Sequence, residues 1–145
     1  MMFHTHDYVL LMLMNTQNEI LLLRRINTDY GNQDYSLIGG KIEAHETARQ
    51  AVIREAKEEI GIDIAVDDLV FQHVVHRKGT ETEFFSFIFL ATKWKGAPAN
   101  LEPEKHDDMR WFSLDALPNN FLPAHRQALD LIKKKITYSE HGWSH

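Results

Sequence analysis

The first part of the chain alternates short apolar runs with polar interruptions. Apolar residues dominate positions 8–14 and 19–26, and the polar residues 15–18 separate them. Because asparagine adopts turn dihedrals readily, the pattern predicts two strands joined as a β-hairpin. A third short strand is predicted over 34–38, and it leads into a turn at Gly39-Gly40.

The apolar spacing becomes helical in the middle of the chain. From about Thr47 to Ile60 the pattern is that of an α-helix, and Gly61 follows as a helix-ending signal. Strands are then predicted over 68–76 and over the aromatic-rich segment 83–94.

The last third of the chain mixes short elements. Residues 110–112 predict a short strand, and 114–117 a single helical turn. Pro123 suits the first turn of a second helix, which is predicted to run to about Lys135. Residues 138–145 are predicted to form a loose tail.

These elements favour a single α/β domain. The chain has 145 residues, a length that fits one domain with its own core. We predict that the domain spans 1–145, with a core over about 5–135. Hairpins and helical crossovers in this order predict a mixed β-sheet sandwiched between α-helices, an α/β/α fold.

Composition excludes several classes of function. The formal net charge of −5 argues against non-specific binding to nucleic acid or to an anionic membrane. With no cysteine, the chain has no disulfides, thiolate metal sites or cysteine nucleophiles. The apolar run over 9–14 is far shorter than the ~20 residues that cross a bilayer, and no basic segment precedes it. A cytoplasmic location is therefore expected.

Three carboxylates share one face of the predicted central helix. At about 100° per residue, Glu55, Glu58 and Glu59 fall within about one third of the circumference. Like charges at this spacing repel one another, and a divalent cation would reverse that effect. Ligands that are all oxygen favour Mg²⁺ or Mn²⁺ over Zn²⁺. The alternative, a solvated acidic face, leaves the glycines on both sides of the segment unexplained.

The segment around this helix resembles the Nudix box, G-x5-E-x7-R-E-U-x-E-E-x-G-U, where U is apolar. The matching residues are in register without a gap, and they are Gly40, Glu46, Arg54, Glu55, Glu58, Glu59, Gly61 and Ile62. Ala56 is small for its position but remains apolar. The resemblance extends over about residues 5–135 and implies the Nudix fold.

The resemblance also implies roles for these residues. Nudix proteins hydrolyse a nucleoside diphosphate linked to another moiety, with a divalent metal held by the helix carboxylates. Glu55, Glu58 and Glu59 would be catalytic and would bind Mg²⁺ together with the carbonyl of Gly39, and Mn²⁺ would substitute. Glu55 or Glu59 would deprotonate or orient the attacking water, and the sequence does not decide between the two residues. The other box residues would be structural, namely Gly40, Glu46, Arg54 and Gly61.

Three features outside the box bear on the substrate. Residues 100–105, Asn-Leu-Glu-Pro-Glu-Lys, resemble a segment of Nudix nucleoside-triphosphate pyrophosphatases that brings a glutamate to the metal. We assign Glu104 to the metal and Glu102 to the substrate, the alternative being a charged surface loop. Arg25 closes the second strand, where mutator-type enzymes place an arginine near phosphate, although a solvated strand end is the alternative.

The third feature is His125, in a segment resembling the one that contacts guanine in mutator-type enzymes. It stands where those enzymes use asparagine, and a neutral histidine offers a different donor and acceptor geometry. Phe85, Phe87 and Phe89 alternate along one strand, and they are either core residues or a source of one stacking residue. Modest discrimination among bases is expected.

The sequence thus predicts a Mg²⁺-dependent pyrophosphohydrolase of the mutator-type branch. It would cleave nucleoside triphosphates, including oxidised or otherwise non-standard dNTPs, to monophosphate and pyrophosphate. Alternative substrates are pteridine triphosphate, dinucleoside polyphosphates and nucleotide sugars, and the alternative class is a non-catalytic nucleotide-sensing Nudix domain. The expected partner is a nucleotide, with no nucleic acid and no membrane, and a homodimer is left open.

Overall fold

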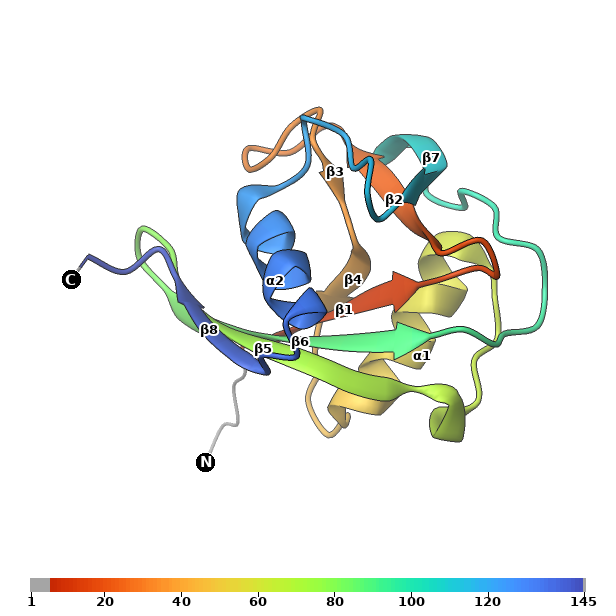
Figure 1. Cartoon of the computed structure of the whole chain (residues 1–145), viewed down its shortest axis with the longest axis horizontal. Helices are drawn as coiled ribbons and strands as arrows, with labels where there is room; N and C mark the ends of the chain where they lie inside the picture. The colour runs from red at the N-terminus through yellow and green to blue at the C-terminus, as the bar shows by residue number, and fades with distance from the viewer. Residues whose placement is uncertain (1–5, 145) are drawn as a thin grey trace.

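The computed structural model describes residues 6–144, so the ends of the predicted domain at 1–5 and 145 lie outside the described residues. Two β-sheets and two α-helices make up the described part of the chain (Figure 1). In chain order the elements are β1 (Tyr8–Leu13), β2 (Glu19–Arg25), β3 (Tyr35–Ser36), β4 (Ile38–Lys41), α1 (Ala48–Ile60), the 3₁₀ turn η1 (Val66–Asp68), β5 (Val70–Lys78), β6 (Glu83–Ala91), β7 (His106–Ser113), α2 (Pro123–Lys133) and β8 (Tyr138–His141).

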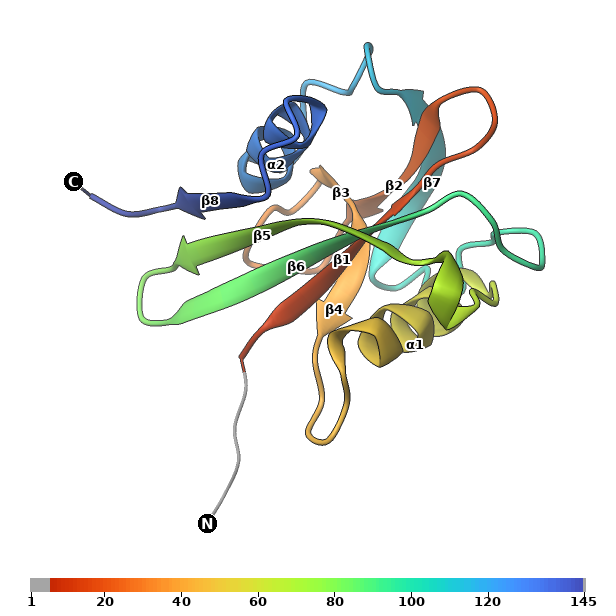
Figure 2. The same cartoon turned by 60° about the horizontal axis from the view of Figure 1, so that its bottom comes forward.

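The predicted α/β/α architecture is confirmed, with the strands divided between two sheets. The larger sheet is mixed, in the order β4-β1-β6-β5-β8, and β1 pairs with β6, and β5 with β8, in parallel. The smaller sheet is antiparallel, in the order β3-β2-β7. The predicted hairpin of the first two strands is wrong, because β1 and β2 belong to different sheets, and an isolated bridge joins Met14, just after β1, to Ile20 of β2. Helices α1 and α2 cover opposite faces of the larger sheet (Figure 2).

The apolar runs near the start of the chain are strands buried on both faces. In β1, Val9 and Leu11 pack toward α1, whereas Leu10 and Met12 pack toward α2. The side chains of β2 also alternate between the two cores, with Leu21 in the core on the α1 side and Leu22 in the core on the α2 side. A strand covered on both faces has no solvent-facing side, and this explains why these runs are continuous rather than alternating.

Helix α1 has the bounds that its capping residues predict. The Thr47 side chain accepts a hydrogen bond from the Gln50 N–H, and the Gln50 side chain accepts one from the Thr47 N–H, at 3.1 and 2.9 Å. This reciprocal arrangement satisfies two backbone donors at the helix start. Gly61 ends the helix in the left-handed conformation, with φ of 71°.

The predicted turn at Gly39-Gly40 is wrong, because both glycines lie inside strand β4. They pair with Leu10 and Val9 of β1. A Cβ atom on Gly39 would lie 2.0 Å from the Val9 carbonyl oxygen, so only glycine allows the two strands to approach this closely. The double glycine marks a close strand contact and not a chain reversal.

The C-terminal third also differs from its prediction. Strand β7 begins at His106 and not at residue 110, because its polar residues pair with β2. Residues 114–117 form a non-helical turn, and not the predicted single turn of helix. Residues 138–141 of the predicted loose tail form β8, which adds a parallel edge strand to β5.

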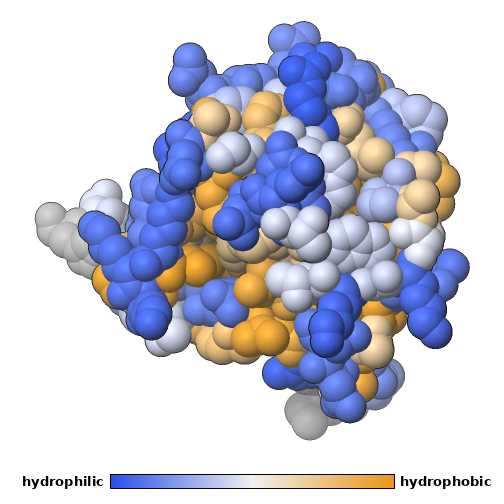
Figure 3. Space-filling view, turned by 45° about the vertical axis from the view of Figure 1, so that its right-hand side comes forward, coloured by the Kyte–Doolittle hydropathy of each residue, from blue (hydrophilic) through white to orange (hydrophobic). Residues whose placement is uncertain are grey.

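The surface of the described part of the chain is mixed in character. Hydrophilic residues are interspersed among apolar ones across the face shown in Figure 3. No helix within residues 6–144 is both long and apolar enough to span a membrane.

Candidate active site

Acidic side chains gather in a cleft of about 500 Å³ that lies along α1 and the end of β4. The acidic residues that line it are Glu43, Glu55, Glu58, Glu59 and Glu102. Helix α1 runs beside β4 in Figure 2, and the cleft is lined by the three predicted helix carboxylates and by Gly39 and Gly40 of β4. The cleft brings the predicted metal-binding residues Gly39, Glu55, Glu58 and Glu59 together.

Arg54 lies at the centre of an ion-pair network on the rim of this cleft. Its Nε lies 2.7 Å from Glu46, and its Nη1 lies 2.8 Å from Glu55 and 3.2 Å from Glu58. Its Nη2 donates to the backbone carbonyl of Lys41 at 2.9 Å. The Arg54 hydrogen bonds hold the pKa of Glu46 below its ordinary value. The network fastens the loop before α1 to the body of the helix.

Glu59 is the most deeply placed carboxylate of the cleft. Glu59 is only 6% exposed. Its side chain shares a hydrogen bond with Glu55 and accepts one from the Gly39 backbone N–H. Burial raises the pKa of Glu59 well above its ordinary value, and the contact with Glu55 acts in the same direction. The cleft therefore holds one carboxyl group away from water and against a second.

Because Gly40 has no side chain, the Glu55 carboxylate can occupy the space beside it. A Cβ atom at position 40 would lie 2.3 Å from a carboxylate oxygen of Glu55. Any side chain here would push Glu55 away from β4, so the glycine of the box has a steric role in forming the cleft.

The carboxylate and carbonyl oxygens of the cleft fit a hard divalent cation, provided that the carboxylates give up their present hydrogen bonds to Arg54 and to each other. Within residues 6–144, no three acidic or imidazole side chains are already arranged to hold a metal. The reason is visible in the contacts, because Arg54 engages Glu55 and Glu58 while Glu59 is bonded to Glu55. Carboxylate and carbonyl oxygens are the ligands that Mg²⁺ and Mn²⁺ take, and they are abundant here.

The loop before β7 brings Glu102, and not Glu104, to the helix carboxylates. Glu102 lines the cleft, pairs with Lys105 at 3.1 Å, and contributes to the raised pKa of Glu59. Glu104 is exposed and lies outside the lining of the cleft, while its backbone carbonyl accepts a hydrogen bond from Asn27. Of the two glutamates, Glu102 thus lies beside the helix carboxylates, and Glu104, which the sequence assigned to the metal, lies outside the cleft. Which of them binds metal or substrate stays a prediction.

A second cavity, of about 450 Å³, adjoins the acidic cleft. The two share Arg25, Gly39, Gly40, Glu59 and His106 as lining residues. The rest of this pocket has a mixed wall. Its aromatic and aliphatic members include Tyr8, Leu10, Tyr30, Phe84 and Leu122, and its polar members include Ser36, Arg77, Thr80, Ser86 and His125. A molecule whose phosphates enter the cleft would thus place its organic part in the pocket.

Arg25 lies where cleft and pocket meet. Its Nε donates to the Tyr30 carbonyl at 3.2 Å, and its guanidinium carbon lies 5.8 Å from the centre of the Tyr30 ring. The neighbouring Arg24 instead pairs with Asp107 at 2.7 Å on the surface. Of the two arginines at the end of β2, Arg25 is the one that lines both the cleft and the pocket.

His125 lies in the pocket wall, at the start of α2. It is 5% exposed, and its Nδ1 accepts a hydrogen bond from the Leu37 N–H at 3.1 Å. Burial lowers the pKa of His125 to about 3, so the ring is neutral at physiological pH. With Nδ1 acting as acceptor, the ring proton resides on Nε2.

This buried neutral histidine predicts acid sensitivity. Between pH 6.5 and 3 the unfolded chain protonates this residue and the folded chain does not, so lowering the pH favours unfolding. At pH 5 His125 is expected to lower the free energy of unfolding by about 2 kcal/mol relative to pH 7. Urea unfolding at both pH values measures the loss, and His125→Asn, which keeps an acceptor for Leu37, should lose less. An equal loss in both proteins would contradict the prediction.

The aromatic strand β6 contributes Phe84 to the pocket, on the face opposite to that of Phe85, Phe87 and Phe89. Phe84 lines the pocket, whereas Phe89 is buried in the core under α1 and Phe85 stacks on His76, with ring centres 4.4 Å apart. Alternation along β6 sends even-numbered and odd-numbered side chains to opposite faces. None of Phe85, Phe87 and Phe89 lines the pocket, and Phe87 and Phe89 pack in or against the core, as the core alternative has it.

Several lining residues escape sequence reasoning because no local motif marks them. Tyr30 comes from the loop after β2, Arg77 from the end of β5, and His106 from the start of β7. Only the sheet topology brings these separate segments together. The strand period of two places Arg77 on the same face of β5 as the buried Val75, but the sequence alone does not mark that face as the wall of a pocket.

Comparison with known proteins agrees with the geometry. The family model described as the NUDIX domain matches residues 4–132. The chain is 31% identical over 125 residues to the 8-oxo-dGTP diphosphatase of Escherichia coli (strain K12), covering 83% of this chain and 90% of that protein. It is 31% identical over 114 residues to the NAD-capped RNA hydrolase NudC of Stutzerimonas stutzeri (strain A1501), covering 79% of this chain and 38% of that protein.

Solved structures show the same likeness. The crystal structure of a MutT NUDIX hydrolase from Burkholderia pseudomallei matches with a TM-score of 0.79 and 28% identity, covering 88% of this chain and 98% of that one. The acidic cleft with its adjoining pocket thus lies on a fold shared with a hydrolase.

Proposed function

This chain belongs to the Nudix family, and we propose that it is a Mg²⁺-dependent pyrophosphohydrolase that cleaves nucleoside triphosphates to monophosphate and pyrophosphate. The observation that carries the proposal is the direct opening of the carboxylate cleft into a pocket with aromatic walls. Likeness to an 8-oxo-dGTP diphosphatase over most of both chains supports a triphosphate, and it adds oxidised dNTPs to the candidate substrates.

We assign the metal to the cleft carboxylates. Glu55, Glu58 and Glu59 would hold it together with the Gly39 carbonyl, and Glu102 replaces Glu104 in this assignment. When bound, Mg²⁺ or Mn²⁺ neutralises phosphate oxygens and acidifies water.

The chain's own residues supply the remaining functions. Arg25 would bind a phosphate oxygen where the cleft meets the pocket. Glu55 or Glu59 would accept the proton of the attacking water, whose oxygen forms the new bond to phosphorus as the anhydride bond breaks. Arg54 would position Glu58 and keep Glu46 against the helix. Gly40 and Gly61 would shape the two ends of the segment.

A substrate comparison tests the proposal. With Mg²⁺ present, kcat/KM is expected to be at least about tenfold higher for dNTPs or 8-oxo-dGTP than for ADP-ribose, dinucleoside polyphosphates or nucleotide sugars. Pteridine triphosphate belongs in the same series because it shares the triphosphate. Release of pyrophosphate is the measurement. A clear preference for ADP-ribose or a nucleotide sugar would discard the triphosphate assignment, and no turnover at all would favour a nucleotide sensor.

The presence of all three helix carboxylates in one cleft favours an enzyme over a sensor. Assembly into a homodimer and a cytoplasmic location stay predictions from the sequence.

A further inference from the structure

Arg77 presents an unpartnered hydrogen-bond donor in the wall of the pocket. Its Nε is buried and has no hydrogen-bond partner within the described residues, and Arg77 lines the pocket but not the acidic cleft. A buried N–H without a partner is unfavourable, and such groups in native proteins usually meet a ligand or water. The donor therefore needs an acceptor that the chain does not supply.

The orientation of this guanidinium is fixed by its neighbours. Its central carbon lies 5.0 Å from the centre of the Phe84 ring and 5.6 Å from that of Tyr30, and its Nη2 donates to the Tyr30 hydroxyl at 2.9 Å. Stacking on two rings and one hydrogen bond hold the plane of the guanidinium. The Nε–H vector is thus set before a ligand arrives.

The pocket wall carries N–H donors that no carboxylate of the described residues engages. Among the described residues, neither Arg77 nor Arg25 forms an ion pair. His125 lines the same pocket with its Nδ1 already occupied, which leaves an Nε2–H donor. A ligand that enters here meets these N–H groups beside the hydroxyls of Ser36, Thr80 and Ser86. An acceptor atom on the ligand would satisfy the unpartnered Nε–H of Arg77.

We propose that Arg77 is a specificity-determining residue that donates a hydrogen bond from Nε to a carbonyl oxygen on the substrate's base. The inference rests on the proposed function, because it takes the phosphates to lie in the acidic cleft. Arg77 lies beyond the cleft, and the 6-position of a purine lies far from its sugar. A 6-oxo purine would place an acceptor against Nε–H, whereas a 6-amino purine would place a donor there.

This proposal replaces the modest base discrimination expected from the sequence. That expectation rested on an apolar slot between phenylalanines, which stacks on any base. A fixed donor instead rejects a base that offers another donor, because two N–H groups would then be left unpaired. Oxo purines are accordingly the favoured class of substrate.

Matched nucleotides give the first test. The bases of dITP and dATP differ in the oxo or amino group at position 6 and in the proton at N1. Wild-type kcat/KM is expected to be about 10- to 100-fold higher for dITP. In Arg77→Met the ratio should fall to near one, mostly through loss of dITP hydrolysis. Arg77→Lys keeps the charge without the fixed Nε–H, and its ratio should also fall.

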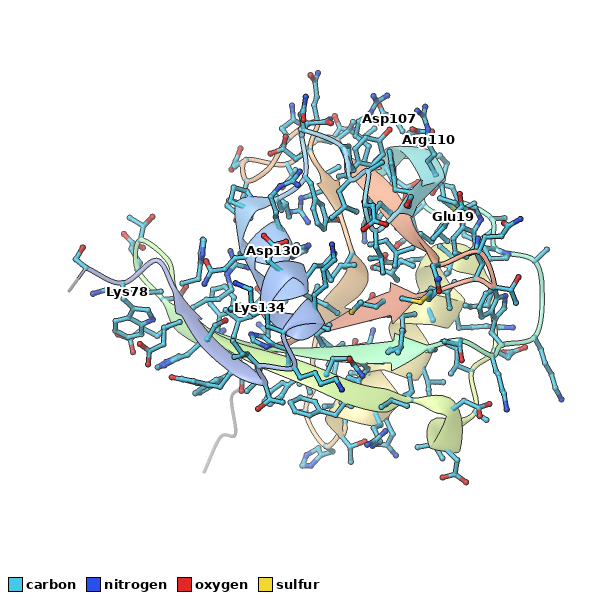
Figure 4. The ribbon with its side chains drawn as sticks, viewed as in Figure 1. Glu19, Lys78, Asp107, Arg110, Asp130 and Lys134 are labelled. Carbon is cyan, nitrogen blue, oxygen red and sulfur yellow. The ribbon has the colours of Figure 1, made fainter. Side chains whose placement is uncertain are left out.

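Lys78→Met is the matched control, because it removes a neighbouring cation of the same strand. Lys78 lies at the outer end of β5 (Figure 4), stacks over Trp143 and does not line the pocket. It should leave both rates and their ratio unchanged. A structural role of Arg77 alone would lower both rates equally in the Met and Lys variants, and that result would overturn the proposal.

Binding of monophosphates separates this inference from the proposed function. Calorimetry without metal is expected to show at least tenfold tighter binding of IMP than of AMP, and Arg77→Met should remove the difference. That result would support the inference even in a chain that hydrolyses no triphosphate, which would overturn the proposed function alone. Equal binding of IMP and AMP by the wild type would overturn the role of Arg77.

Discussion

Glu59→Gln is expected to lower kcat by at least about 100-fold while the chain stays folded. The substitution keeps the side-chain volume but removes one charge from the acidic cleft, where a cation and phosphate oxygens are to be balanced. An amide at position 59 is able to donate to Glu55 and to keep the existing hydrogen bond, so the core around it is preserved. Steady-state hydrolysis and a thermal melt measure the two effects.

Two companion variants complete the test. Glu83→Gln removes a carboxylate from an exposed position at the start of β6, and it should retain the wild-type rate. Glu58→Gln should lose activity as Glu59→Gln does. Near-wild-type turnover by both helix variants at saturating Mg²⁺ would remove these carboxylates from the metal assignment.

Removal of divalent cations is expected to lower hydrolysis by at least about 100-fold, and added Mg²⁺ or Mn²⁺ should restore it. Zn²⁺ should restore little, because the cleft offers neither thiolates nor grouped histidines. A cation that binds only the folded chain also stabilises it, by about 2.7 kcal/mol at 100 times its Kd. This corresponds to a rise in Tm of about 5 to 10 °C.

The rise in Tm gives a readout that does not depend on the substrate. In Glu58→Gln the Mg²⁺-induced rise should shrink, since one proposed ligand loses its charge. Activity that survives exhaustive chelation, or a Tm unaffected by Mg²⁺ in the wild type, would contradict the metal assignment.

Features with a local cause could be predicted from the sequence. The bounds of α1 follow from Thr47 and Gly61, which act on backbone groups within one turn. The two first strands follow from runs of apolar residues that are covered on both faces. Contacts between distant segments could not be predicted in this way. Strand β8 is polar, and only its pairing with β5 makes it a strand.

The residues of the candidate site likewise fall into those that are close in sequence and those that only the fold brings together. The helix carboxylates are close in sequence, so one helical period places them together. Glu102 and Glu104 are only two residues apart, and the fold of their loop decides which of them faces the cleft. The residues of the pocket come from separate strands and loops, and Arg77 owes its position to the alternation of β5 and to the rings of Tyr30 and Phe84.

The contacts of Arg54 have a consequence for metal binding. Its guanidinium serves as an internal counter-ion for Glu55 and Glu58, but its bonds to Glu46 and to the Lys41 carbonyl anchor it independently. We therefore expect the release of the two helix carboxylates to need rotations of side chains, while the loop and α1 keep their positions. A cation that binds as proposed would then meet a backbone already in place.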